Sequence, residues 1–186
     1  MLAFTIFILI LVNPIGAQNQ LREFKKADSN YRIKFPEDHG QHKNFRLEWW
    51  YITANLSSET FGELGIQWTL FKNEIDLNDK EQPWSLSSFW MAHSAITTQK
   101  RHFFEERFAR RGMALAGVTM SPFKAWIDNW TARGDNQLTK LTIKSNGENF
   151  SYNLQLETNL SPILQGENGF SVKSADGNAS HYYSQP

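Results

Sequence analysis

Short segments in which large apolar residues alternate with polar ones recur along this chain, and this pattern constrains its fold most strongly. Alternation places residues i and i+2 on one face of a strand, whereas a helix needs apolar residues three and four apart. Strands are predicted at residues 46–56, 63–71, 88–97, 123–131, 138–144 and 150–157, with a short one at 170–173. Short strands without alternating helices predict an all-β fold, an antiparallel barrel or sandwich.

Two further features of the pattern refine this prediction. The dipeptide Asn146-Gly147 separates segments 138–144 and 150–157, and it suits the positive φ angles of a tight hairpin turn. Residues 102–112 are ambiguous, because the spacing of their Phe and Arg residues also suits a short helix.

Large side chains occupy both faces of segment 46–56, and we therefore expect this strand to be covered on both sides. One face carries Leu47, Trp49, Tyr51 and Thr53, and the other carries Glu48, Trp50, Ile52 and Ala54.

The amino terminus has the layout of a secretory signal peptide. An uncharged apolar run at residues 2–12 is followed by Asn13-Pro14 and by the small residue Ala17, after which cleavage is expected. The run is shorter than the roughly 20 residues that span a bilayer, so no stable membrane span is predicted. The alternative is an uncleaved anchor. We therefore expect a signal peptide at 1–17, a lead-in segment at 18–34, and a secreted or periplasmic protein of the bacterial envelope.

Composition narrows the classes of function. Lys and Arg equal Asp and Glu at 19 each, so no net charge draws the chain to nucleic acid. The absence of Cys excludes cysteine catalysis and thiolate metal sites. The 14 Phe, seven Trp and five Tyr suit either a β core or a pocket for an apolar ligand.

Glu48 is the first candidate for chemistry. A carboxylate on a strand buried on both sides must be paired or hydrogen-bonded, and Arg46, two residues away on the same face, is the expected partner. The alternative is a carboxylic acid in an apolar pocket, which could protonate a substrate.

Four other side chains are candidates with open alternatives. His39 and His42 could organise the mouth of a pocket, or they could hydrogen-bond their loop onto the sheet. A metal site with Glu48 or His93 as a further ligand is a minor alternative. Neither a metal nor a cofactor is predicted. His93, on one face with Phe89 and Met91, is either a satisfied core histidine or a pocket acid or base. Asp128, between Trp126 and Trp130 on one predicted strand face, is either an edge carboxylate or a group that supports protonation of an apolar substrate.

Several segments together resemble one family. Residues 35–42, Phe-Pro-Glu-Asp-His-Gly-Gln-His, and 46–53, Arg-Leu-Glu-Trp-Trp-Tyr-Ile-Thr, resemble the opening signature of the AttH-like and carotenoid 1,2-hydratase (hydroxyneurosporene synthase) family. Residues 92–95, 128–130, 164–173 and 179–184 resemble its later blocks in the same order.

This resemblance implies two lipocalin-like β domains. Residues 35–173 would form the first, and 174–186 would begin a second that the chain does not complete. It also implies an exported protein, since some family members are labelled predicted secreted hydrolases and some are associated with an ABC transport system. The best-known activity of the family adds water to a carotenoid double bond, which needs an acid, a base and aromatic faces for the carbocation.

The sequence therefore predicts an exported lipocalin-like protein that binds an apolar lipid or isoprenoid and that hydrates or hydrolyses it if it is an enzyme. The alternatives are a non-catalytic binding protein of an envelope ABC transport system and a glycan-binding module. The predicted proton-handling residues are Glu48, His93 and Asp128. The predicted substrate-binding residues are His39, His42, Trp49, Trp50, Tyr51 and Trp130.

Overall fold

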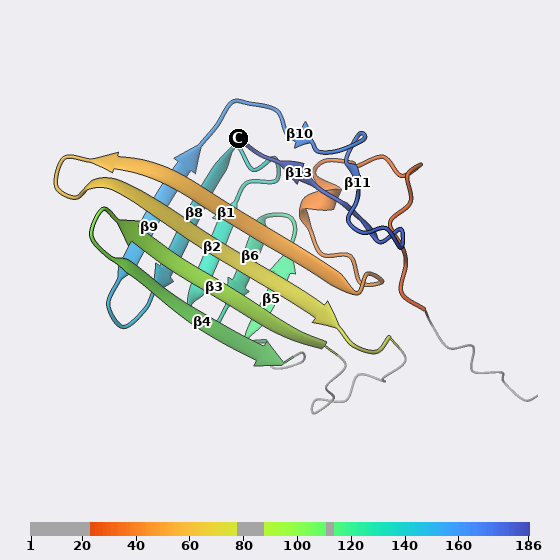
Figure 1. Ribbon diagram of the computed structural model, residues 1–186, viewed down its shortest axis with the longest axis horizontal. Helices are drawn as coiled ribbons and strands as arrows, with labels where there is room; N and C mark the ends of the chain where they lie inside the picture. The colour runs from red at the N-terminus through yellow and green to blue at the C-terminus, as the bar shows by residue number, and fades with distance from the viewer. Residues whose placement is uncertain (1–22, 78–87, 111–113) are drawn as a thin grey trace, which may run out of the picture.

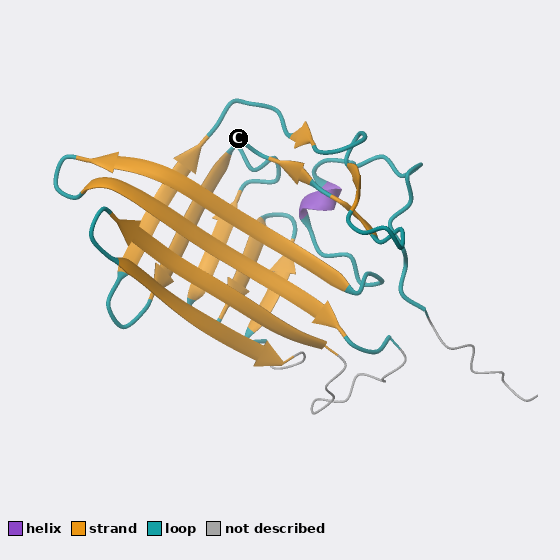
Figure 2. Ribbon diagram, in the orientation of Figure 1, coloured by secondary structure: helices purple, strands orange, loops and turns teal. Residues whose placement is uncertain are grey.

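The computed structural model describes residues 23–77, 88–110 and 114–186, and their strands form two facing antiparallel sheets (Figure 1; Figure 2). The first sheet has the order β1 (Leu47–Ser58), β2 (Gly62–Glu74), β3 (Ser88–Thr98) and β4 (His102–Arg110). The second has the order β5 (Ala116–Thr119), β6 (Phe123–Ile127), β7 (Trp130–Gly134), β8 (Lys140–Asn146) and β9 (Ser151–Glu157). The predicted all-β, lipocalin-like antiparallel fold is confirmed.

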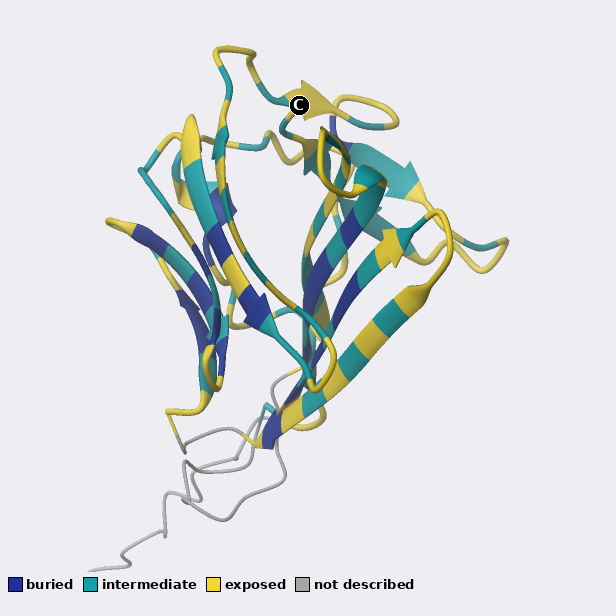
Figure 3. Cartoon of the chain, turned by 90° about the vertical axis from the view of Figure 1, so that its left-hand side faces the viewer, coloured by how far each residue is buried: buried dark blue, intermediate teal, exposed yellow. Residues whose placement is uncertain are grey.

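The core lies between the two sheets, where each strand turns every second side chain inward (Figure 3). Trp68 and Leu70 of β2 and Trp90 and Ala92 of β3 supply the first sheet's side. The second sheet contributes Val118, Phe123, Ala125, Ile127, Trp130, Ala132 and Ile143. Burial of this apolar surface is the main force that holds the sheets together.

The remaining elements gather beside the sandwich, near the start of β1 (Figure 1). The short 3-10 helix η1 (Glu37–His39) precedes β1. Strand β10 (Ile163–Leu164) pairs with β13 (Tyr183–Ser184), and β11 (Phe170–Val172) pairs with β12 (Ala179–His181). The predicted strand at 170–173 is therefore confirmed.

The helical alternative for residues 102–112 is wrong over the part that the structure describes, because His102–Arg110 forms strand β4. It pairs with β3 from Phe89↔Arg110 to Thr97↔His102. Phe104 and Phe108 point outward and Ala109 inward, so the apparent helical spacing comes from two aromatic residues on one strand face.

The single strand predicted at 123–131 is also wrong, because the chain reverses at Asp128-Asn129. Asp128 has a φ of 54°, and Ile127 pairs with Trp130 across the turn. The reversal puts Trp126 on the outer face of the sheet and Trp130 in the core, so these residues and Asp128 do not share a face. The hairpin predicted at 138–157 is confirmed, but Asn146-Gly147 is not a turn with positive φ angles. Asn146 still pairs with Ser151, and the loop closes with a hydrogen bond from the N–H of Gly147 to the carbonyl of Phe150.

Strand β1 is covered on one face only, which corrects the prediction of two covered faces. Tyr51 is 56% exposed and Leu47 is also exposed, because these residues lie on the outer surface of the first sheet. Trp50 and Ile52 pack against the core on the other face.

The predicted signal peptide at 1–17 lies outside the described residues. Within residues 23–77, 88–110 and 114–186, no helix has the length and apolarity needed to cross a membrane.

Candidate functional site

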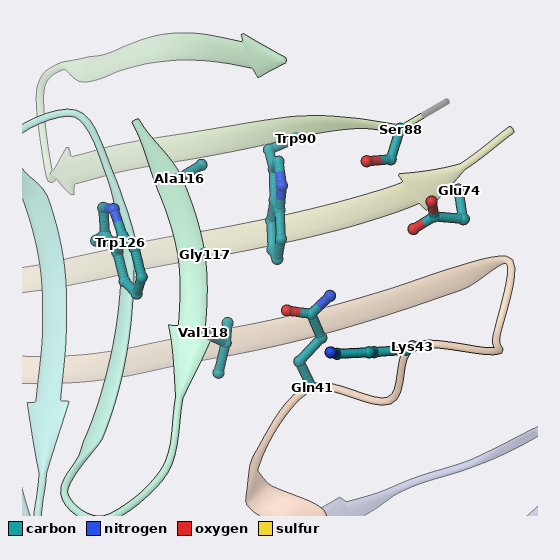
Figure 4. Close-up of a pocket in the computed structure, with 9 residues that line it drawn as sticks. All are labelled: Gln41, Lys43, Glu74, Ser88, Trp90, Ala116, Gly117, Val118 and Trp126. Carbon is teal, nitrogen blue, oxygen red and sulfur yellow. The ribbon is translucent and has the colours of Figure 1, made fainter. Parts of the chain in front are cut away.

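A pocket of about 270 Å³ opens between the sheets, where β2 ends, β3 begins and β5 runs past them (Figure 4). Its lining combines a buried carboxylate and a hydroxyl with an apolar wall. The lining residues are Gln41, Lys43, Glu74, Ser88, Trp90, Ala116, Gly117, Val118 and Trp126.

The polar end of this pocket is a continuation of the core faces of two strands. On β2 the inward positions that carry Trp68 and Leu70 continue into Lys72 and Glu74. Glu74 pairs with Ser88 in the strand register, so both side chains turn into the gap between the sheets. Glu74 is only 4% exposed, and Ser88 is also buried.

The apolar wall is centred on Trp90, which stands between β5 and the first sheet (Figure 4). Its ring stacks on Trp50 at a centroid distance of 6.1 Å. The indole of Trp50 donates a hydrogen bond of 3.0 Å to the carbonyl of His39. This bond fixes the loop that carries Gln41 and Lys43 to the pocket mouth.

A buried charge cluster lies directly beside Glu74. The Nζ atom of Lys72 is 2.9 Å from Glu48 Oε2, 3.6 Å from Glu74 Oε2 and 3.1 Å from the carbonyl of His42. Lys72 is 1% exposed, and an ammonium this deeply buried requires such partners. Glu48 and Lys72 meet because they are paired in the β1–β2 register.

His42 links this cluster to the surface. Glu48 Oε1 accepts a hydrogen bond of 2.7 Å from the backbone N–H of His42 and lies 2.9 Å from the Nδ1 atom of the His42 ring. The Nε2 atom of the same ring lies 3.0 Å from Asp38 Oδ1. The hydrogen bond to Glu48 and the bond to Asp38 together raise the pKa of His42, against the effect of burial. The carboxyl of Glu48 thus bonds with Lys72 and His42 rather than with the predicted partner, Arg46.

Asp38 is itself held by several donors. Tyr31 donates its hydroxyl to Asp38 at 2.8 Å, and the backbone N–H of Lys34 donates at 2.7 Å. Burial opposes ionisation of Asp38, but the bonds from Lys34, His42 and Tyr31 outweigh it and lower its pKa. Burial and the neighbouring Asp38 raise the pKa of Tyr31 to about 12.

Replacing Glu48 with Gln is expected to lower the pKa of His42, because it removes the negative charge and the strongest acceptor at Nδ1. Since the folded-state pKa is raised, the contribution of His42 to stability is complete below its unfolded pKa of about 6.5. That contribution disappears as the pH rises through the folded-state pKa. Titration of the imidazole by NMR measures the shift, with Glu63→Gln as an exposed control. An unchanged pKa of His42 in Glu48→Gln would contradict the contact between Glu48 and Nδ1 of His42.

His39 has a separate, structural environment. It is buried, its Nδ1 lies 2.5 Å from the hydroxyl of Tyr183, and its ring contacts Phe35. Burial lowers the pKa of His39. His39 and His42 therefore face different partners. The part of the chain that the structure describes contains no group of three or more His, Asp or Glu side chains that could hold a metal ion.

The other predicted proton-handling residues lie away from the pocket. His93 is half-buried on the outer face of the first sheet, where its Nε2 lies 4.0 Å from Glu106. Asp128 is 66% exposed in the β6–β7 turn and pairs with Arg107 at 2.7 Å. The structure thus separates Glu48, His93 and Asp128 into three environments.

The aromatic residues predicted to bind substrate also lie in different parts of the structure. Trp50 packs behind the pocket wall, whereas Trp49 and Tyr51 lie on the outer face of β1. Trp130 is a core residue.

The sequence prediction missed Lys72, Glu74, Ser88 and Trp90 as site residues. A signal was present, because the inward alternation of β2 continues two positions beyond Leu70 into charged residues.

The two facing antiparallel sheets and the pocket between them define a lipocalin-like β protein. The sequence model of the AttH-like family matches residues 26–186, and the chain belongs to this family. A crystal structure named provisionally as an AttH, from Nitrosomonas europaea, is similar with a TM-score of 0.74 and 27% sequence identity. The match covers 88% of this chain and 49% of that one, so this chain spans about half the length of that structure. No curated protein matches the chain.

Proposed function

We propose that this protein binds a small apolar molecule, a lipid or an isoprenoid, in the pocket between its sheets. The observation that carries the proposal is a pocket whose wall is Trp90 and Val118 and whose buried end is Glu74 and Ser88. An apolar lining with a few convergent polar groups is the usual composition of a small-molecule site. The volume of about 270 Å³ suits a short chain or one end of a longer one.

The buried charge cluster supports a second candidate, hydration or hydrolysis of the bound molecule by acid–base chemistry. Such reactions need one group that donates a proton and another that activates water. Glu74 lies in the pocket, and Lys72 connects it to Glu48 and His42. Incubating the protein with a bound unsaturated isoprenoid or a lipid ester, and analysing products by mass spectrometry, separates an enzyme from a carrier.

Export to the bacterial envelope and service to an ABC transport system remain part of the proposal, on the basis of the amino-terminal sequence and the family resemblance. Glycan binding is an alternative that Trp49 and Tyr51 leave open, because both lie on the outer face of β1, where an aromatic ring could stack on a sugar. Trp50 and Trp90 stack inside the molecule and favour the apolar pocket instead.

Native mass spectrometry of the protein purified from its own envelope is expected to detect a bound lipid or isoprenoid. Replacing Ala116 with Leu should fill the pocket from β5 and weaken binding of that molecule about tenfold or more. Thr119→Leu is the matched control, since Thr119 lies exposed on the outer face of the same strand.

Two results would contradict the proposal. One is equal binding by the Ala116→Leu variant and the wild-type protein. The other is an empty protein that ignores a lipid panel and is retained on a glycan array.

A further inference from the structure

We propose that Lys124 and Arg133 form a binding site for a phosphate group on the outer face of the second sheet. Both side chains line a second hollow of about 340 Å³, which lies at the turn from β5 to β6, beside the end of β7. Its lining shares no residue with the pocket between the sheets. The inference is therefore independent of the proposed function and concerns a ligand group of different chemistry.

The first argument is the position of the two cations relative to each other. Lys124 of β6 and Arg133 of β7 are directly opposite in the strand register, and both belong to the outer face of the sheet. Like charges at directly opposite positions destabilise a pair of strands. An anion held between them would replace this repulsion with two attractive interactions.

The second argument is that neither cation has an anionic partner among the residues that the structure describes. The guanidinium of Arg133 is exposed and forms no ion pair or side-chain hydrogen bond with a described residue. The Nζ atom of Lys124 lies 4.2 Å from the ring centroid of Trp126. This cation–π contact holds the ammonium on the outer face but does not neutralise its charge.

The charges nearby keep this face positive. Lys144 is exposed on the same face, on β8. Lys140 lies 3.6 Å from Glu157, so the charge of that carboxylate is already shared. Asp135, close to Arg133 in the sequence, accepts hydrogen bonds from the backbone N–H and the hydroxyl of Thr139.

A phosphate group suits these side chains better than a single carboxylate does. A phosphate monoester carries a charge of roughly −1.5 to −2 at pH 7, which matches two cations. The guanidinium of Arg133 can donate two parallel hydrogen bonds to phosphate oxygens, and the ammonium of Lys124 can bind as a point charge. Ser121, exposed in the β5–β6 turn, lines the hollow and can donate its hydroxyl to a further oxygen. Small soluble molecules and lipid headgroups both carry such a group, and the test separates these two sources.

The test measures binding to both sources. Isothermal titration calorimetry measures the affinity for glycerol 3-phosphate, and flotation measures binding to phosphatidylcholine vesicles with and without phosphatidic acid. We expect the wild-type protein to bind at least one source, and the double variant Lys124→Met with Arg133→Met to lose about tenfold or more of that affinity. The matched control is Lys100→Met with Arg101→Met, which removes the same two charges from the exposed β3–β4 turn. Arg133→Lys keeps the charge but loses the paired donors, so it should weaken binding by a smaller factor.

The outcomes are distinct. Binding of glycerol 3-phosphate identifies a small phosphorylated ligand, and binding confined to the phosphatidic acid vesicles identifies a lipid headgroup. Either result supports the inference if the double variant loses the binding and the control keeps it. No binding to either source overturns the inference. An equal loss in the control also overturns it, because binding would then follow the overall charge of the protein.

Circular dichroism checks that the double variant is folded. If it is not, Arg133→Lys and Ser121→Ala decide instead, because both change exposed side chains. Wild-type affinity in both of these variants would overturn the inference. None of these results bears on the pocket between the sheets, so the proposed function stands or fails separately.

Discussion

Replacing Lys72 with Met is expected to lower the free energy of unfolding by about 3–5 kcal/mol, the usual cost of removing one partner from a buried ion pair. The substitution keeps the apolar stem but removes the ammonium that lies 2.9 Å from Glu48 and 3.6 Å from Glu74. Both carboxylates lie in the interior, and removing this shared counter-charge leaves their negative charge less well compensated where water cannot screen it. Urea denaturation followed by tryptophan fluorescence measures the loss.

The control is Lys144→Met, because Lys144 is exposed on the outer face of β8 and its substitution should change stability by no more than about 0.5 kcal/mol. The double variant Lys72→Met with Glu48→Gln should recover part of the loss, since it removes one of the two carboxylates. If Lys72→Met costs under about 1 kcal/mol, the value of an exposed pair, the cluster is not buried in solution.

Alternation along the sequence was enough to predict the fold class, because each strand of a two-layer sandwich buries one face and exposes the other. The predictions failed where alternation is interrupted without an obvious signal. The turn at Asp128-Asn129 shifts the alternation by one residue, because Ile127 and Trp130 both point inward although they are three positions apart. A period of two continued across the turn places Trp126, Asp128 and Trp130 on one face, which is wrong. Local pattern also could not say that the outer face of β1 lacks a covering layer, because that depends on packing.

The candidate site was predictable only in part. Glu48, His42 and Trp50 stand in one short stretch of sequence, and the structure gathers them beside the pocket. The residues that complete the site come from the β2–β3 hairpin. The second predicted strand, 63–71, ends just before Lys72 and Glu74, because charged residues at a strand end usually face water. Here they face inward, since the register places Lys72 opposite Glu48.

Replacing Trp130 with Ala is expected to destabilise the protein by about 3–5 kcal/mol, the range for removing a large buried aromatic side chain. Trp130 is 0% exposed and donates its indole N–H to the carbonyl of Asn146 at 2.7 Å. The guanidinium of Arg107 lies 4.4 Å from its ring centroid and also bonds with Asp128. Because Arg107 belongs to β4 and Trp130 to β7, these contacts join the two sheets, and denaturant unfolding measures their combined loss.

Two variants separate the contributions. Trp130→Phe keeps an aromatic ring in the core but leaves the carbonyl of Asn146 without this donor, so about 1–3 kcal/mol of the loss should remain. Trp49→Ala removes an indole from the half-buried outer face of β1 and should cost clearly less than Trp130→Ala, because that face still contacts water. Equal losses for Trp130→Ala and Trp49→Ala would mean that the outer face is covered in solution. The pocket would then lie within a larger assembly, because the described sandwich leaves this face open.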